Sequence, residues 1–274
     1  MSKMKKIGAI VIMALMFTSC SEYYKVLNKG TIQTQYKMAS EMYEDKDYRK
    51  AIQLFEKITP GFRGKPQMER IQFMISDSYY QTKDYTSSAY FFDRFTNNYP
   101  KSTKKEEAAF LAAHSFYLDT APYSLDQMTT NEAMVALQSF IDTYPDSNRI
   151  EEASNCVQEL RYKLETKSFE TAKQYFHLED YTAAITSFDN FIGDNLGTKY
   201  REEAMYLKFS AGYELSMKSI FRKKENRIEN AIKYYEKFKK SYPDSEYLKD
   251  SDKKIVALNK EKAAYEELVA SFEN

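Results

Sequence analysis

The chain has 274 residues, and its 40 Lys and Arg residues balance 40 Asp and Glu residues. A net charge of zero gives no overall electrostatic attraction to nucleic acid or to an anionic membrane, so neither partner is indicated. Gly and Pro are few, at 7 and 6, which favours helices, while 24 Tyr and 18 Phe supply rings for packing between them. The length accommodates one elongated array or two compact domains.

The N-terminus has the features of a lipoprotein signal. Lysines at the start precede an uncharged apolar run over residues 7–17, and Cys20 follows two small residues. The run is about half of the ~20 residues that a membrane-spanning helix needs, which favours a cleaved signal peptide over residues 1–19. We expect Cys20 to be the site of lipid attachment, with residues 20–31 as anchor and linker. An ordinary secretory signal with an incidental cysteine is the alternative.

A repeat motif begins with Asp-Tyr, has a small residue three positions after the Tyr and a Phe seven positions after it, and ends with an acid. The three copies start at Tyr48, Tyr85 and Tyr181, with small residues Ala51, Ser88 and Ala184, Phe residues Phe55, Phe92 and Phe188, and acids Glu56, Asp93 and Asp189. The small residue lets one helix approach the next closely, and the Phe fills the seam between them. Looser versions centre on Leu137 and Tyr235.

A Tyr-Pro-x-Ser corner follows three of the expected helices. The corners are residues 99–102, 144–147 and 242–245. Pro is expected to stop one helix and Ser to cap the next. Together with the repeat motif, the corners predict an all-α fold, a right-handed superhelical solenoid of about five tetratricopeptide-like helix pairs plus a C-terminal capping helix.

The apolar periodicity divides the mature chain into residues 32–147, with the first three repeats, and 148–274, with repeats four and five and the terminal helix. Between turn signals it predicts helices from residue 33 onward and then over residues 48–58, 68–81, 85–98, 104–118, 132–144, 149–178, 181–192, 199–220, 227–241 and 246–272. Residues 119–130, with Pro122 and Tyr123-Ser124-Leu125-Asp126-Gln127, are expected to form a longer connection.

The sequence contains none of the motifs that carry catalysis or metal binding. There is no HExxH, no Cys/His cluster, no phosphate-binding glycine loop and no nucleophile elbow. His114 and His177 are expected at interfaces or on the surface, and Cys156 is expected to pack as a small apolar residue. We therefore predict a protein that is not an enzyme and has no cofactor or metal, with a peptidoglycan hydrolase as the alternative from another class.

Two surfaces are candidates for binding. An aromatic groove for an extended apolar peptide is predicted in the first repeats, and packing in the core is the alternative for its residues, Tyr36, Tyr43, Phe73, Tyr79 and Tyr80. A basic run is predicted to dock an acidic partner surface, and a solvated C-terminal helix end is the alternative for its residues, Lys218, Arg222, Lys223, Lys224 and Arg227.

The chain resembles the BamD family, lipoproteins of the outer-membrane β-barrel assembly machinery, in a Bacteroidetes-type version. The resemblance covers nearly the whole mature chain. It rests on Cys20-Ser21-Glu22-Tyr23 with Lys25-Val26-Leu27, on Asp47-Tyr48-Arg49-Lys50-Ala51-Ile52, on Tyr117-Leu118-Asp119 with Tyr123-Ser124-Leu125-Asp126-Gln127, and on the three corners.

The resemblance implies a lipid-anchored scaffold on the outer membrane, facing the periplasm. Its C-terminal repeats would dock the periplasmic domains of the central barrel subunit, alongside other lipoproteins of the machinery. Its N-terminal repeats would capture unfolded outer-membrane β-barrel proteins for insertion. A general envelope scaffold lipoprotein for cell-wall or export complexes is the alternative.

Overall fold

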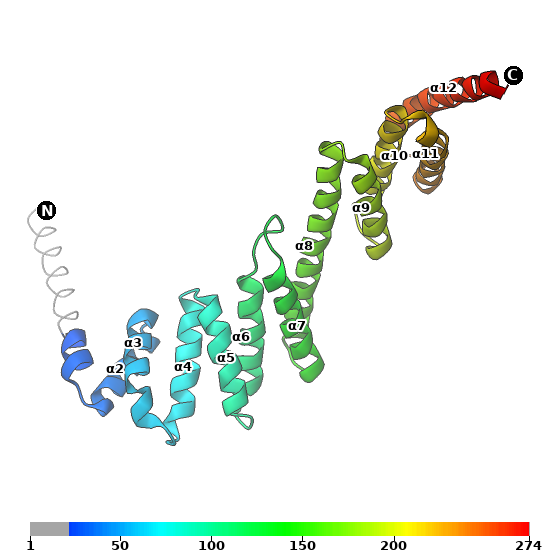
Figure 1. The fold of residues 1–274 in the computed structure, drawn as a ribbon. Coiled ribbons are helices and arrows are strands. Elements are labelled where there is room, and N and C mark those ends of the chain that lie inside the picture. Colours follow the sequence, from blue (N-terminus) through cyan, green and yellow to red (C-terminus); the bar gives the residue numbers. More distant parts are fainter. Residues whose placement is uncertain (1–21, 274) are drawn as a thin grey trace, which may run out of the picture. The chain divides into compact units, whose positions relative to one another are not determined.

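The computed structural model describes residues 22–273. Within this range the secondary structure is helical throughout, with turns between the helices (Figure 1). A first helix covers the described residues 22–29. The elements that follow are α2 (Ile32–Glu44), α3 (Tyr48–Ile58), η1 (Thr59–Phe62), α4 (Gln67–Gln81), α5 (Tyr85–Asn98), α6 (Lys105–Leu118), α7 (Met128–Thr143), α8 (Ile150–His177), α9 (Tyr181–Asp194), α10 (Arg201–Met217), α11 (Phe221–Ser241) and α12 (Leu248–Glu273).

Helices that follow each other in the chain pack against each other, as in α2 with α3, α4 with α5 and α10 with α11. This arrangement confirms the predicted all-helical class built from tetratricopeptide-like pairs. The chain divides into two compact units. Unit 1 comprises residues 1–121 and 125–160, and unit 2 comprises residues 122–124 and 161–274. The helix α8 supplies residues to both units, whereas the division predicted from the sequence lies just before it.

The repeat motif is buried as its chemistry requires. The small residues and the Phe residues of all three copies are 0% exposed: Ala51, Ser88, Ala184, Phe55, Phe92 and Phe188. The Asp that starts each copy lies at the N-terminus of its helix. The Asp84 side chain accepts a hydrogen bond from the Ser87 N–H at 3.1 Å, and Asp180 does the same with Ala183 at 3.1 Å.

The residue before each motif Asp has left-handed backbone geometry. Lys46, Lys83 and Glu179 have φ values of 63°, 63° and 59°. Each of them ends the preceding helix, and the next N–H bonds back to that helix, as from Asp84 to the Tyr79 carbonyl at 3.0 Å. This is the Schellman ending, which usually takes Gly at the left-handed position. The short turn between the two helices is therefore formed by this hydrogen-bonding pattern and does not require a glycine.

The Ser of the Tyr-Pro-x-Ser corner was predicted to cap the first turn of the next helix, but its hydroxyl bonds in the turn just before that helix. The Ser hydroxyl accepts a bond from the N–H two residues later, as Ser102 does from Lys104 at 3.0 Å and Ser147 from Arg149 at 3.2 Å. The helix begins at the following residue, so the hydroxyl closes the entry turn rather than the first helical turn. Thr198 accepts the same bond from Tyr200 at 3.2 Å, which makes residues 195–198 a fourth corner without Pro.

Two helices start earlier than the periodicity indicated. The helix α7 begins at Met128, where residue 132 was expected, and α11 begins at Phe221, where residue 227 was expected. Before α11 the chain turns at Ser219-Ile220, without Gly or Pro to mark the break. The basic run was therefore assigned to the end of one helix, although most of it lies at the start of the next.

The segment expected as a linker packs against the core over residues 22–29. Tyr23 is 3% exposed, and its hydroxyl donates to Gln53 Oε1 at 2.8 Å. The Gln35 amide donates to the carbonyl of Leu27 at 2.9 Å. Among the described residues, no helix is long and apolar enough to cross a membrane. The predicted signal peptide and Cys20 lie outside the described residues.

Candidate functional site

The predicted groove residues lie half-buried in the seams of unit 1, in two separate core clusters. Tyr36 packs on Phe62 with ring centroids 5.3 Å apart. The Tyr43 hydroxyl donates to Asp77 Oδ2 at 2.5 Å. Burial, followed by this bond, raises the pKa of Tyr43, so the phenol stays neutral and donates.

The other groove residues join α4 to its neighbours. Phe73 meets the edges of Phe92 and Phe95 at 5.7 and 5.5 Å. The Tyr80 hydroxyl is 2.7 Å from His114 Nδ1. All five groove residues are thus partly used in packing, and a peptide groove formed by their remaining surface stays a prediction.

His114 lies inside this aromatic seam. Its ring stacks between Phe110 and Tyr117, with centroids 5.4 Å from each. Burial is the main cause that lowers the pKa of His114, with a smaller and opposite effect from Glu152. A neutral imidazole therefore packs here, which agrees with the expected interfacial role.

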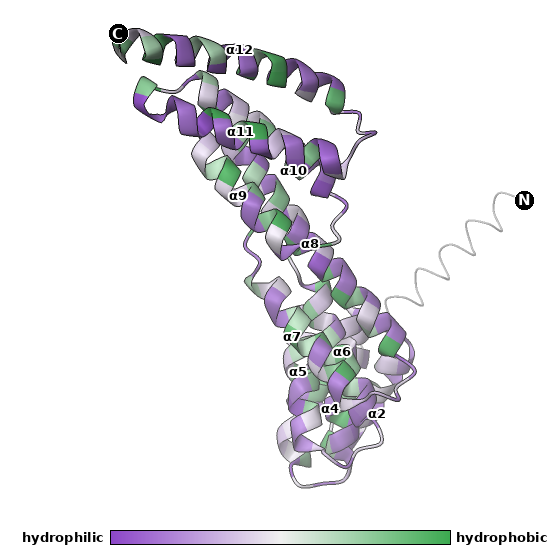
Figure 2. Cartoon of the chain, turned by 90° about the vertical axis from the view of Figure 1, so that its right-hand side faces the viewer, coloured by the Kyte–Doolittle hydropathy of each residue, from purple (hydrophilic) through white to green (hydrophobic). Residues whose placement is uncertain are grey.

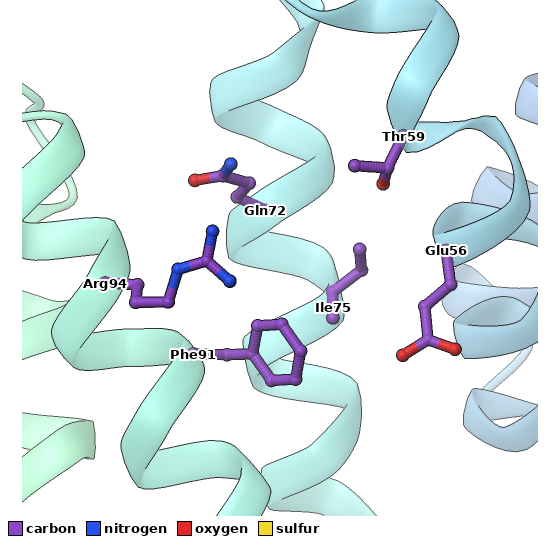
Figure 3. Close-up of a pocket in the computed structure, with 6 residues that line it drawn as sticks. All are labelled: Glu56, Thr59, Gln72, Ile75, Phe91 and Arg94. Atoms are coloured by element: carbon purple, nitrogen blue, oxygen red, sulfur yellow. The ribbon is translucent and has the colours of Figure 1, made fainter.

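A pocket of about 260 Å³ opens between α3 and α5, with α4 as its floor (Figure 3). The lining residues are Glu56, Thr59, Gln72, Ile75, Phe91 and Arg94. Figure 3 shows the Glu56 carboxylate on the α3 side and the Phe91 ring and Arg94 guanidinium on the α5 side, with Ile75 between them. The pocket thus combines an apolar floor, an aromatic wall, an anion and a cation.

The two walls of the pocket are held by Tyr79, a predicted groove residue. Its ring stacks on Phe91, with centroids 5.1 Å apart and planes 3° from parallel. Its hydroxyl donates to Glu56 Oε1 at 2.6 Å. Burial and this bond raise the pKa of Tyr79, so it remains a neutral donor. Glu56 keeps its second carboxylate oxygen for another donor.

The repeat motif identifies Glu56 as its acid, but the sequence does not predict the pocket. Phe91 precedes the motif Phe, and it packs against a different core cluster from the one that contains Phe92. An aromatic pair at this point, with Arg94 one turn later, was the signal in the sequence. This pattern predicts a pocket only once it is known which helices pack together.

The five cations of the predicted basic run have different roles in the structure. Lys218 donates to Glu179 Oε2 at 2.7 Å, and this bond raises the pKa of Lys218. Lys224 pairs with Glu261 of α12. Arg227 donates to the Ser219 hydroxyl at 2.8 Å. These three cations therefore serve contacts within unit 2.

Arg222 and Lys223 differ from the rest of the run. Both are exposed, and neither forms an ion pair in the part of the chain that the structure describes. They lie in the first turn of α11, which has no acidic residue. Cations are unfavourable at this positive end of the helix dipole, so the predicted alternative of a stabilised C-terminal helix end does not apply to them.

Apolar side chains accompany these two cations. Ile220 is 62% and Phe221 46% exposed. The Phe221 ring packs against Tyr265 of α12 with centroids 4.8 Å apart. The start of α11 is therefore an exposed apolar and basic surface of unit 2. The helix α12, which carries Tyr265, also shows alternating hydrophilic and hydrophobic bands (Figure 2).

A comparison with protein families identifies the chain. The model of the YfiO family, described as outer membrane lipoprotein, matches residues 29–226 and 168–274. The chain belongs to the YfiO family. This confirms the resemblance to BamD, because the matches cover most of the chain, and it places this member in a non-catalytic family of outer membrane lipoproteins.

Comparisons with individual proteins add less about this YfiO-family chain. No curated protein sequence matches it. Among solved structures, a kinesin light chain of Podosopora anserina with nearly identical TPR-like repeats is 11% identical, covers 76% of this chain and 96% of its own, and has a TM-score of 0.32. A computationally designed, self-assembling cyclic homooligomer is 16% identical, covers 97% of this chain and 99% of its own, and has a TM-score of 0.21. The fold assignment rests on the chain's own helix packing.

Proposed function

We propose that this protein is an outer-membrane protein assembly factor, a non-catalytic scaffold that is anchored by lipid at Cys20 and faces the periplasm. It binds the barrel-assembly machinery and captures unfolded β-barrel proteins for insertion. The observation that carries the proposal is the family match over residues 29–226 and 168–274. A chain of packed helix pairs supports it, because such repeats offer extended surfaces for binding other proteins.

Affinity purification from membranes tests the proposal directly. The expected result is recovery of a large outer-membrane barrel protein together with other lipoproteins. Recovery of cell-wall or export enzymes in its place would contradict the assembly role and favour the alternative of a general envelope scaffold. A purification that is free of any barrel protein would also contradict it.

Cys20→Ser tests the anchor. Without the acylated sulfur, the protein should leave the membrane fraction and appear in the soluble fraction, since several acyl chains are needed for stable anchoring. Cys156→Ser is the matched control, because Cys156 is buried in the core of unit 1. Unchanged fractionation of Cys20→Ser would refute the anchor.

We propose that the partner surface of unit 2 includes Arg222 and Lys223, since they are exposed beside Ile220 and Phe221 and form no ion pair with any residue that the structure describes. The double charge reversal to Glu should reduce recovery of the barrel partner and leave the helical circular dichroism unchanged. The reversal of Lys233 and Lys240, also exposed on α11, is the control. Equal recovery from both variants would show that the first turn of α11 is only a solvated face.

We propose that unfolded barrel substrates are captured in unit 1, by the exposed parts of the aromatic residues of α2 and α4. A photo-crosslinking residue at Tyr36 should then capture a substrate barrel protein from envelope extracts, because an extended apolar strand can lie against exposed ring surface. The same residue at Tyr175, an exposed ring of unit 2, is the control. Equal capture at both positions would contradict a groove in unit 1.

A further inference from the structure

The pocket of unit 1 has an equivalent in unit 2, residue for residue. It lies between α9 and α11 over α10 and is lined by Asp189, Ile192, Met205, Lys208, Tyr234 and Lys237. The motif acid stands in the same place in both, as Glu56 and as Asp189. A ring that precedes the seam residue also stands in the same place, as Phe91 and as Tyr234. The repeats thus build the same pocket twice.

In unit 2 this pocket is filled by a lysine of the chain itself. Lys208 is 9% exposed, and its ammonium donates to the Asp189 carboxylate. The same ammonium lies 4.1 Å from the centroid of the Tyr234 ring. With Lys208 in place only about 20 Å³ remain open. An acid and an aromatic face are the two groups that recognise an ammonium in a partly buried site.

In unit 1 the acid and the ring are kept, and the lysine is replaced. Ile75 occupies the position of Lys208, so nothing from α4 reaches the Glu56 carboxylate except the Tyr79 hydroxyl. Tyr79 itself occupies the position of Gly212, where a Cβ would come within 3.0 Å of Tyr234. The Tyr79 ring at this place stacks on Phe91, and the pocket beside them is open.

We propose that the pocket between α3 and α5 binds a lysine side chain of a partner protein. The methylene stem packs on Ile75 and along Phe91, and the ammonium donates to the free oxygen of Glu56. In unit 2 a lysine is bound to the equivalent acid and the equivalent ring, Asp189 and Tyr234. This inference does not depend on the barrel-assembly role, because it concerns the chemistry of one pocket.

The cation at the rim does not exclude a second cation. Arg94 lies 5.4 Å from the centroid of the Tyr90 ring, and its Nη1 is 3.3 Å from the Tyr90 hydroxyl. The equivalent residue in unit 2 is Lys237, and Lys208 is bound there all the same. One carboxylate and one ring thus hold an ammonium beside a rim cation.

A third groove supplies the matched control. It lies between α5 and α7 over α6, and it has the motif acid Asp93 but Ala136 in the place of the ring. Its own rings, Phe116, Phe140 and Tyr144, lie at other positions of the repeat. Without a ring at the position of Phe91 and Tyr234, this groove lacks the pairing of acid and ring that holds Lys208 in unit 2. Asp93→Asn therefore removes the same charge without altering the proposed site.

Nuclear magnetic resonance of the isoleucine methyl groups tests the proposal on the full mature chain. Titration with Nα-acetyl-lysine-N-methylamide should shift the Ile75 signal with a millimolar dissociation constant, the order expected for a ligand of this size. The norleucine analogue has the same stem without the ammonium and should bind at least about tenfold more weakly.

Two variants decide the outcome. Glu56→Gln should weaken lysine binding about tenfold, whereas Asp93→Asn should leave it unchanged. Equal effects of the two substitutions would show a general electrostatic attraction and overturn the proposal. Equal binding of the lysine and norleucine compounds would overturn it as well, because it would make the pocket an apolar site.

The pocket of unit 2 gives a second test. Lys208→Ala should lower the melting temperature, and n-butylammonium, which has the shape of the missing side chain, should restore part of it. Butanol should restore less. Equal rescue by both compounds, or rescue by neither, would contradict ammonium recognition by the shared acid and ring.

Discussion

Units 1 and 2 use the same helix pairs but join them with different side chains. In unit 1, tyrosine hydroxyls bind carboxylates or other acceptors across the seams, as Tyr43 with Asp77 and Tyr79 with Glu56. In unit 2, lysines do most of this, as Lys173 with Glu203 at 3.1 Å. Two tyrosines of unit 2, Tyr206 and Tyr235, also donate to carboxylates. Further lysine pairs join Lys208 to Asp189, Lys218 to Glu179, Lys224 to Glu261 and Lys239 to Asp252.

Phenol hydrogen bonds and lysine ion pairs should respond differently to salt. A neutral phenol that donates to a half-buried acid is little affected by salt. Exposed ion pairs are screened by salt and contribute little each. Unit 1 should therefore keep its stability over a wide range of ionic strength, and unit 2 should depend on it. The apolar cores of both units carry most of the stability.

The largest expected effect concerns the apolar cores, which carry most of the stability of both units. Phe92→Ala in unit 1 and Phe188→Ala in unit 2 each remove a side chain that is 0% exposed, and each should cost about 3–5 kcal/mol. Hydrogen exchange followed by mass spectrometry should show lost protection in the unit that carries the substitution. Equal loss in both units from either variant would show that the two cores unfold as one.

A smaller loss of stability distinguishes the tyrosine–carboxylate bonds of unit 1 from those of unit 2. Tyr43→Phe leaves Asp77 half-buried without its phenol donor and should cost about 1–2 kcal/mol. Tyr235→Phe removes a similar bond to Asp252, but Lys239 still donates to that carboxylate at 3.2 Å, so the loss should be smaller. Chemical denaturation compares the two. A larger loss from Tyr235→Phe would reverse the comparison.

The next effect depends on pH and should affect unit 1 first. The native pKa of His114 lies below its usual value, so the unfolded chain binds more protons as the pH falls through about 6.5. Unit 1 should thus lose stability between pH 7 and pH 5. Exchange corrected for intrinsic rates measures this loss. His114→Gln should flatten the pH dependence, and an unchanged slope would assign it to another group.

The smallest effect is that of salt. Raising sodium chloride from 0.05 to 1 M should reduce protection at the contacts of α11 with α12, where Lys239 and Asp252 form a half-exposed ion pair. Exchange in α3 to α5 should change less. Equal change in both regions would contradict the inference that ion pairs between helices matter more in unit 2.

The sequence predicted the helices where turn chemistry marks them. The range 85–98 between Asp84 and the first corner agrees with α5 at both ends, because an N-cap and a Pro define it. The start of α11 was missed because Ser219-Ile220 turns without Gly or Pro. Local signals thus define an element only where the chain ends it with a residue of special geometry.

The candidate site was less predictable for a different reason. Glu56 was identified as a motif acid, but its relation to Phe91 depends on how α3 and α5 both pack on α4. Ile75 in the place of Lys208 decides whether the pocket is open, and it can be recognised only after the two helices are superimposed position by position. Contacts between helices are set by packing that no single segment of sequence contains.

Sequence-local packing has a consequence for how the chain acquires its structure. Nearly all contacts between the described helices join elements that follow each other closely along the chain. Chains with such a low contact order fold quickly, because little loop entropy is lost before a contact forms. A chain that reaches its compartment N-terminus first can complete each helix pair on the one before it, and it exposes only one unfinished seam at a time.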